Sequence, residues 1–180
     1  MVLIYAPFVL QALAMMVDEF YFHQKRTLPK WERIGHPLDT LTVLACLFWL
    51  LLVVPTATTV GVYVGLSIFS SVFILKDEPI HRRVCESIEH GLHVLLFTLH
   101  PLVLISAGLL WPALHADTAS AFPLVRFAGW ERPFFLANLT VIVLFLVYQT
   151  VYWNFLWPVF AADKQRHLSK SPFPVPEGLE

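Results

Sequence analysis

Residues 76–101, KDEPIHRRVCESIEHGLHVLLFTLHP, place a dense group of acidic and histidine residues directly before an apolar segment. Read as one helix that turns by about 100° per residue, the stretch brings several ionisable side chains within an arc of roughly 100° on one face. These side chains are Glu86, Glu89, His90, His93 and His100. Ionisable groups are rare in membrane helices, because they lose their hydration there unless they bind partners or ions. The stretch therefore predicts a metal site at a membrane surface.

The composition of the whole chain is typical of an integral membrane protein. Of its 180 residues, 57% are hydrophobic and 14% are charged, and the mean hydropathy is +0.67. These values lie far from those of an average soluble domain. The net charge of −1 provides no broad positive surface, so we expect the lipid bilayer and no nucleic acid as a partner.

Five apolar segments are long enough, or nearly long enough, to cross a bilayer as helices. We expect an all-α integral membrane protein in which about five transmembrane helices form one bundle over residues 1–162, followed by an extended, polar, proline-rich tail at 163–180. The predicted spans are residues 2–17, 41–54, 60–75, 79–111 and 134–160. The first helix is expected to continue beyond the lipid at its C-terminal end. It lacks a basic region and a cleavage site, which favours a retained helix over a signal peptide.

Lysine and arginine concentrate in three polar segments, which are residues 18–40, residues 76–88 and the tail. Such residues favour the cytosolic side of a membrane. The pattern predicts an N-terminus outside and a C-terminus in the cytosol, in a bacterial inner membrane. The polar His/Asp/Glu cluster then lies at the cytosolic end of the bundle.

The candidate metal ligands come from four parts of the chain: the end of the first span, the connection over residues 24–40, the segment after the third span, and the polar face of the fourth. They are Glu19, His23, His36, Asp39, Glu78, His81, Glu86, Glu89, His90, His93 and His100. One ion needs fewer ligands, so the set predicts a dinuclear site. Asp18, at a helix end, is expected to face water instead, and Glu32, in the basic connection, is expected to be a solvated charge or a partner in a salt bridge.

The ligand types indicate the metal and the chemistry. Imidazole with carboxylate suits iron, zinc and manganese, and Glu78 and His81 have the Glu-x-x-His spacing of helical di-iron carboxylate proteins. We expect two iron ions, with zinc or manganese as alternatives, in an oxidoreductase of the oxygenase, hydroxylase or desaturase type. Its substrate would be lipid-soluble, and it would need a redox partner. The ligand set is similar in chemistry to that of membrane fatty-acid hydroxylases and desaturases, although their HxxHH boxes are absent.

Two other functional classes fit the sequence. A zinc-dependent membrane hydrolase would attack a lipid ester, amide or phosphoester through a zinc-activated water, although the HExxH motif of zinc proteases is absent. A non-catalytic metal- or haem-binding subunit of a larger membrane complex is the other class. Haem held between two spans is disfavoured, because only the fourth span carries histidines at depth.

Overall fold

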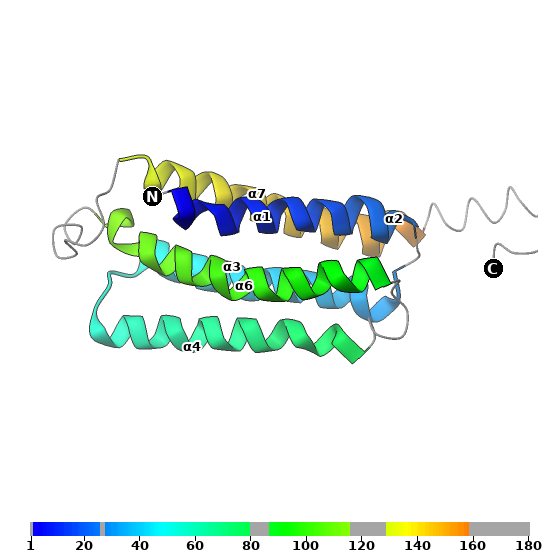
Figure 1. Ribbon diagram of the computed structural model, residues 1–180, viewed down its shortest axis with the longest axis horizontal. Coiled ribbons are helices and arrows are strands. Elements are labelled where there is room, and N and C mark those ends of the chain that lie inside the picture. Colours follow the sequence, from blue (N-terminus) through cyan, green and yellow to red (C-terminus); the bar gives the residue numbers. More distant parts are fainter. Residues whose placement is uncertain (1, 26–27, 80–86, 116–128, 159–180) are drawn as a thin grey trace, which may run out of the picture.

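The computed structural model describes residues 2–25, 28–79, 87–115 and 129–158, and every regular element within these ranges is helical. Five helices are long and apolar enough to cross a membrane. They lie side by side along one axis, and consecutive long helices run in opposite directions (Figure 1). The prediction of an all-α chain with five long apolar helices is therefore confirmed for the described residues.

Two of the long helices continue into a π-helical turn, and one ends in a 3₁₀ turn. The elements in chain order are α1 (Val2–Val17), η1 (Asp18–Phe22), α2 (His23–Lys25), α3 (Lys30–Leu52), α4 (Ala57–Phe73), η2 (Ile74–Asp77), α6 (Ser87–Leu114), α7 (Glu131–Val151) and η4 (Tyr152–Leu156).

The second span is where the sequence prediction and the structure differ most. The prediction of a connection up to residue 40 and a span from 41 is wrong, because α3 begins at Lys30, with Pro29 as its N-cap. Proline fixes φ and lacks an N–H group, so it suits the start of a helix, where that group needs no partner. The first helix continues past the predicted span, as expected, and ends at Lys25. The start of the fourth span and the tail at 163–180 lie outside the described residues.

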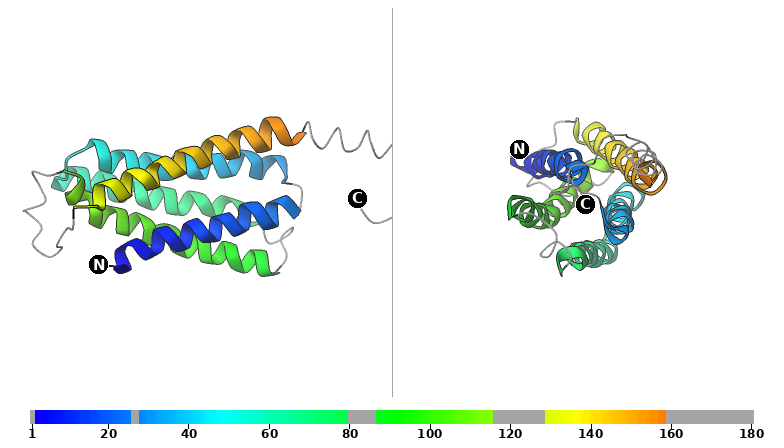
Figure 2. Two further views of the ribbon diagram at one scale, coloured as in Figure 1. Left: turned by 90° about the horizontal axis from the view of Figure 1, so that it is seen from above. Right: turned by 90° about the vertical axis from the view of Figure 1, so that its right-hand side faces the viewer.

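Seen from one end, the long helices form a ring in the order α1, α7, α3, α4 and α6 (Figure 2). Contacts join α1 to α6, α6 to α4, α4 to α3, and α3 to both α7 and α6. The core between them is apolar, and Leu47, Leu50, Leu104 and Leu110 are among its fully buried side chains. Although α1 and α7 are neighbours in the ring, α1 packs mainly on α6, and α7 packs mainly on α3.

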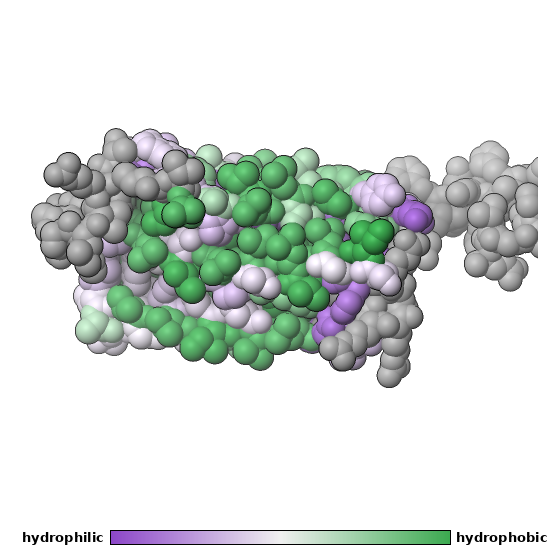
Figure 3. Space-filling model, viewed as in Figure 1, coloured by the Kyte–Doolittle hydropathy of each residue, from purple (hydrophilic) through white to green (hydrophobic). Residues whose placement is uncertain are grey.

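The face seen in Figure 3 carries a broad apolar band along the middle of the bundle, with polar residues toward the ends. Large apolar side chains are also exposed on three different long helices, for example Ile68 of α4, Ile105 of α6 and Leu144 of α7. A monomer in water rarely exposes so wide an apolar surface, whereas lipid would cover it. The five candidate spans and this band together indicate a multi-pass membrane protein.

A close contact at Gly108 fixes α4 against α6. The hydroxyl of Tyr63 donates a hydrogen bond of 2.5 Å to the carbonyl of Leu104, and a Cβ atom on Gly108 would lie 3.0 Å from Cε1 of the same ring. Because the hydrogen bond holds the ring in place, the ring has little freedom to move away. A side chain at Gly108 would push the two helices apart.

We predict that Gly108→Ala lowers the free energy of unfolding by on the order of 1 kcal/mol, because overpacking at a fixed ring outweighs the gain in helix propensity. Thermal unfolding in detergent, followed by circular dichroism, measures the change. Gly91→Ala is the matched control, since nothing lies within 4 Å of the Cβ position there. The control should be at least as stable as the wild type. Equal melting temperatures for Gly108→Ala and Gly91→Ala would show that the close contact between Gly108 and Tyr63 does not limit the packing of α4 on α6.

Candidate metal centre

A glutamate followed by a histidine four residues later recurs on three helices. Residues at this spacing lie on the same face of a helix, so each helix presents both side chains together. The pairs are Glu19 and His23, Glu32 and His36, and Glu89 and His93; a fourth pair in the sequence, Glu86 and His90, begins outside the described residues. The first helix ends where α3 and α6 begin, so all three pairs meet at the same end of the bundle (Figure 1).

The first group of possible ligands comprises Asp18, His23, Glu89 and His93. Each offers one ligand atom, and these atoms all lie within 4.8 Å of one another. Nε2 of His93 lies 3.0 Å from Oδ1 of Asp18, and Nε2 of His23 lies 3.3 Å from Oδ2 of Asp18. All four residues are buried. Two imidazoles and two carboxylates at such separations could hold a metal ion.

A second group lies beside the first and shares His23 with it. His23, Glu32 and His36 place one ligand atom each within 4.8 Å of one another. The imidazole rings of His23 and His36 are stacked, with their centroids 5.0 Å apart. Glu32 has an exposed fraction of 0%. The described residues therefore contain two adjacent groups, and His23 joins them.

Glu19 adds a fourth carboxylate to the cluster. Its Oε2 lies 3.3 Å from Nδ1 of His23, and its Oε1 accepts a hydrogen bond from Nε1 of Trp153. Trp153 is buried in η4, so α7 contributes to the cluster through the π-helical turn that follows it. A carboxylate that contacts an imidazole in this way fixes the orientation of the ring.

The turn η1 explains why two consecutive acidic residues face the cluster. Adjacent residues of an α-helix point about 100° apart, yet Asp18 and Glu19 are both buried and both lie near His23. A π-helical turn inserts one residue into the helix, and such turns are frequent at functional sites. Here it brings both carboxylates to the same imidazole.

Five of the predicted ligands come together in the structure, and four others lie outside the two groups. The five are Glu19, His23, His36, Glu89 and His93. Asp39 lies outside the two groups, where its Oδ1 is 2.6 Å from Nζ of Lys76. His90 is partly exposed, and its Nε2 lies 3.8 Å from Oε1 of Glu78, outside both groups.

His100 lies deeper in the bundle, where its Nε2 is 2.9 Å from Oγ of Ser70. The structure thus places it, like Asp39, Glu78 and His90, apart from the two groups. The remaining predicted ligands, His81 and Glu86, lie outside the described residues.

Two residues of the cluster were missed. Asp18 was expected to face water, and Glu32 to be a solvated charge or a salt-bridge partner. The expectation of solvent exposure is wrong for both, since both are buried in the cluster. Glu32 was assigned to a connection, but α3 begins before it. The recurrence of Glu-x-x-x-His on three segments could have identified Glu32. For Asp18 the sequence offers only its position beside Glu19.

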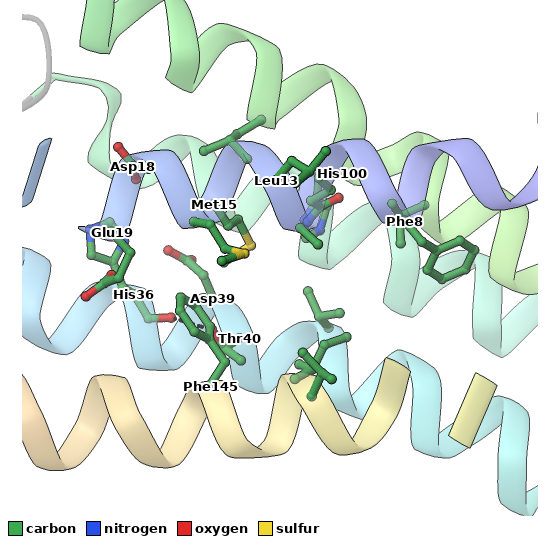
Figure 4. Close-up of a pocket in the computed structure, with 18 of the residues that line it drawn as sticks. Phe8, Leu13, Met15, Asp18, Glu19, His36, Asp39, Thr40, His100 and Phe145 are labelled. Atoms are coloured by element: carbon green, nitrogen blue, oxygen red, sulfur yellow. Dashed lines mark hydrogen bonds between the residues drawn. The ribbon is translucent and has the colours of Figure 1, made fainter. Parts of the chain in front are cut away.

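A cavity of about 520 Å³ extends from the cluster into the bundle between α1, α3, α6 and α7. Asp18, Glu19 and His36 lie at one end of it and Phe8 at the other (Figure 4). Apart from the cluster, its walls are mainly aliphatic and aromatic. A largely apolar cavity with a few polar groups at one end is the usual form of a small-molecule site.

The cavity also reaches the outer surface between α1 and α7. Leu13 and Met16 of α1 and Val141 of α7 line it, and their exposed fractions are 55%, 55% and 60%. Ring contacts bound the cavity on this side at both ends, where Tyr5 of α1 meets Phe134 of α7 and Phe20 of η1 meets Tyr148 of α7. The opening between α1 and α7 therefore lies at the level of the apolar band.

No protein family, curated protein or solved structure matches this chain. The site must be interpreted through its own geometry. That geometry defines a helical chain with five candidate membrane spans and a buried His/carboxylate cluster that could hold a metal ion.

Proposed function

We propose that this chain is an integral membrane oxidoreductase that binds two iron ions at the cytosolic membrane interface and acts on a lipid-soluble substrate. The observation that carries the proposal is the buried group of Asp18, His23, Glu89 and His93, which has a second group beside it and an apolar cavity leading from it. Mixed imidazole and carboxylate ligands suit iron, and the cavity suits a lipid.

Charge supports two ions rather than one. The cluster contains the carboxylates of Asp18, Glu19, Glu32 and Glu89, all of them buried. Burial of ionised carboxylates is costly unless positive charge lies close by. Two divalent cations would balance four negative charges. A neutral imidazole has one free lone pair, so His23 would bind one of the two ions, with His36 and His93 as the other neutral ligands.

The chain's own residues would orient the ligands and exclude water. Trp153 of η4 donates a hydrogen bond to Glu19, and Glu19 contacts His23, so η4 helps to fix the orientation of the His23 imidazole. The apolar cavity wall would keep water from the reacting group, and the opening between α1 and α7 would admit a lipid directly from the membrane. Bound iron would supply the redox chemistry. In a hydroxylation, for example, O₂, two electrons from an external donor and two protons convert a C–H bond to C–OH and release one water.

The proposed orientation follows from the positive residues. Lys25, Lys30 and Lys76 belong to the end of the bundle that holds the cluster, and the N-terminus of α1 lies at the other end (Figure 1). Because lysine and arginine favour the cytosolic side, this end would face the cytosol of a bacterial cell. A membrane-associated or soluble redox partner could then reach the cluster from that side.

A zinc-dependent membrane hydrolase is the second candidate. Asp18, His23, Glu89 and His93 form a complete set of four by themselves, and two histidines with carboxylates also suit a single zinc ion. Such a site would activate water against a lipid ester, amide or phosphoester. The identity and number of the bound ions separate the two candidates.

Oxygen uptake by iron-loaded protein tests the proposed oxidation. Purified protein in detergent, with a chemical reductant and a total membrane lipid extract, is expected to consume O₂ faster than it does without the lipid. Glu89→Gln should abolish the lipid-dependent part, and the matched control Glu78→Gln, outside both groups, should retain it. Iron-loaded, folded protein whose oxygen uptake does not depend on lipid would contradict an oxidative function.

A further inference from the structure

The cavity has a second polar position about halfway along its length, formed by Gln11 of α1 and His100 of α6. These helices are antiparallel and in contact, and Asp18 meets His93 across them at the cluster. Gln11 precedes Asp18 by two helical turns, and His100 follows His93 by the same number. The antiparallel register therefore places Gln11 and His100 at one level. Figure 4 shows His100 between Met15 and Phe8 along the cavity.

The imidazole of His100 is fixed in a way that leaves one nitrogen for a ligand. Its exposed fraction is 5%, and its Nε2 lies 2.9 Å from Oγ of Ser70. Ser70 is itself 2.7 Å from Oγ1 of Thr42, so the ring is held from α4 and α3. Oγ1 of Thr42 donates to the carbonyl of Asp39. Ser70 therefore donates to Thr42 and accepts from the N–H of Nε2 of His100. This leaves Nδ1 of His100 as an acceptor that it can offer to the cavity.

Gln11 offers a donor at the same level. Its Oε1 is buried and has no hydrogen-bond partner among the residues that the structure describes. A buried atom is closed to a molecule in the cavity. Gln11 lies on the cavity wall, so its amide would meet a bound group through the N–H of Nε2.

The spacing of the two polar positions sets a length. Seven residues of α-helix separate His93 from His100, which corresponds to about 10 Å at about 1.5 Å per residue. An extended hydrocarbon chain, with bonds of about 1.5 Å and angles of about 111°, advances about 1.25 Å per bond. About eight or nine carbon–carbon bonds would therefore join a group at the cluster to a group at Gln11 and His100.

We infer that the cavity binds a lipid with two polar groups, a head at the metal cluster and an uncharged, hydrogen-bonding oxygen on its chain, which Gln11 and His100 bind. A hydroxyl group fits both partners, because it donates to Nδ1 of His100 and accepts from the N–H of Nε2 of Gln11. The rest of the chain would extend toward Phe8 and Phe134, whose rings meet edge to face at 5.4 Å. The position of the head rests on the proposed function, whereas the second contact does not require the metal to be reactive.

Competition binding tests the inference. Purified wild-type protein in detergent is equilibrated with tritiated 1-octadecanol, which is then displaced by unlabelled 1-octadecanol, octadecane-1,10-diol or octadecane-1,4-diol. We expect the 1,10-diol to compete about tenfold better than the other two, because only its second hydroxyl reaches Gln11 and His100 and gains hydrogen bonds there. Equal competition by the 1,10- and 1,4-diols in the wild type would overturn the inference without any variant.

Two variants locate the contact. Gln11→Leu is nearly isosteric and should bring the 1,10-diol down to the level of 1-octadecanol, while 1-octadecanol itself binds as before. Asn138→Leu removes another amide of the cavity wall and should leave the preference intact. A preference that survives Gln11→Leu would overturn the inference. If none of the three alcohols bound to protein that carries its metal, the inference about the lipid would be overturned. The proposed metal site would be unaffected by that result. A preference shown by protein that binds no metal, even after incubation with Fe²⁺, would support the second contact and count against the proposed function alone.

Discussion

Replacement of His93 by alanine is expected to lower the affinity for the metal by at least about 100-fold, because a direct ligand contributes more than the 10- to 100-fold typical of the residues around it. His93 is buried, and its Nε2 lies 3.0 Å from Asp18 within the first group. Titration of metal-free protein with Fe²⁺ under anaerobic conditions, followed by elemental analysis, measures the loss.

His90→Ala is the matched control for His93. It removes the same chemical group three residues earlier on α6, where the imidazole is partly exposed and lies beside Glu78 rather than in either group. The control should bind metal like the wild type. Folded His93→Ala protein with wild-type metal content would exclude His93 as a ligand, and an equal loss in both variants would point to an effect on α6 as a whole.

Glu32→Gln is expected to lower the metal content from two ions per chain to one. Glu32 is completely buried and belongs to the second group, which shares only His23 with the first. Glutamine has nearly the same shape, so packing is preserved while one ligand and one negative charge are lost. Asp18, Glu89 and His93 would keep the first ion, and elemental analysis of the purified variant gives the stoichiometry.

Glu78→Gln provides the control for this second change, because Glu78 lies outside both groups. It should retain two ions per chain. A Glu32→Gln variant that keeps both ions would place the second ion elsewhere. If folded Glu32→Gln protein lost both ions together, the first group could not bind an ion by itself. That result would contradict two adjacent, separate positions.

Hydropathy was sufficient to predict the fold, because lipid-crossing helices need long apolar segments whatever their tertiary contacts. All five segments form helices in the structure. The same argument failed at residues 30–40, because a polar sequence is equally compatible with a connection and with the polar first turns of a helix. Glu32 was misplaced for this reason, and its burial depends on the early start of α3 at Lys30.

The site could be predicted where local spacing was informative. Glu19 with His23 was recognised as a pair four residues apart, and Glu89 and His93 as neighbours on one face of α6. Tertiary packing decided the rest. Asp39 pairs with Lys76, which is distant in sequence, and Trp153 reaches Glu19 from the last helix. No local pattern indicates either contact, and the cavity depends on how four helices pack.

The most direct test of the two-metal site is the number and identity of metal ions bound to wild-type protein purified in detergent, measured by plasma mass spectrometry against protein mass. We predict about two iron ions per chain, because the two groups that share His23 provide separate positions and four carboxylates to balance the charge. One zinc ion per chain would favour the hydrolase instead. Folded protein that binds no metal in stoichiometric amount, even after incubation with Fe²⁺ or Zn²⁺, would contradict the metal site itself.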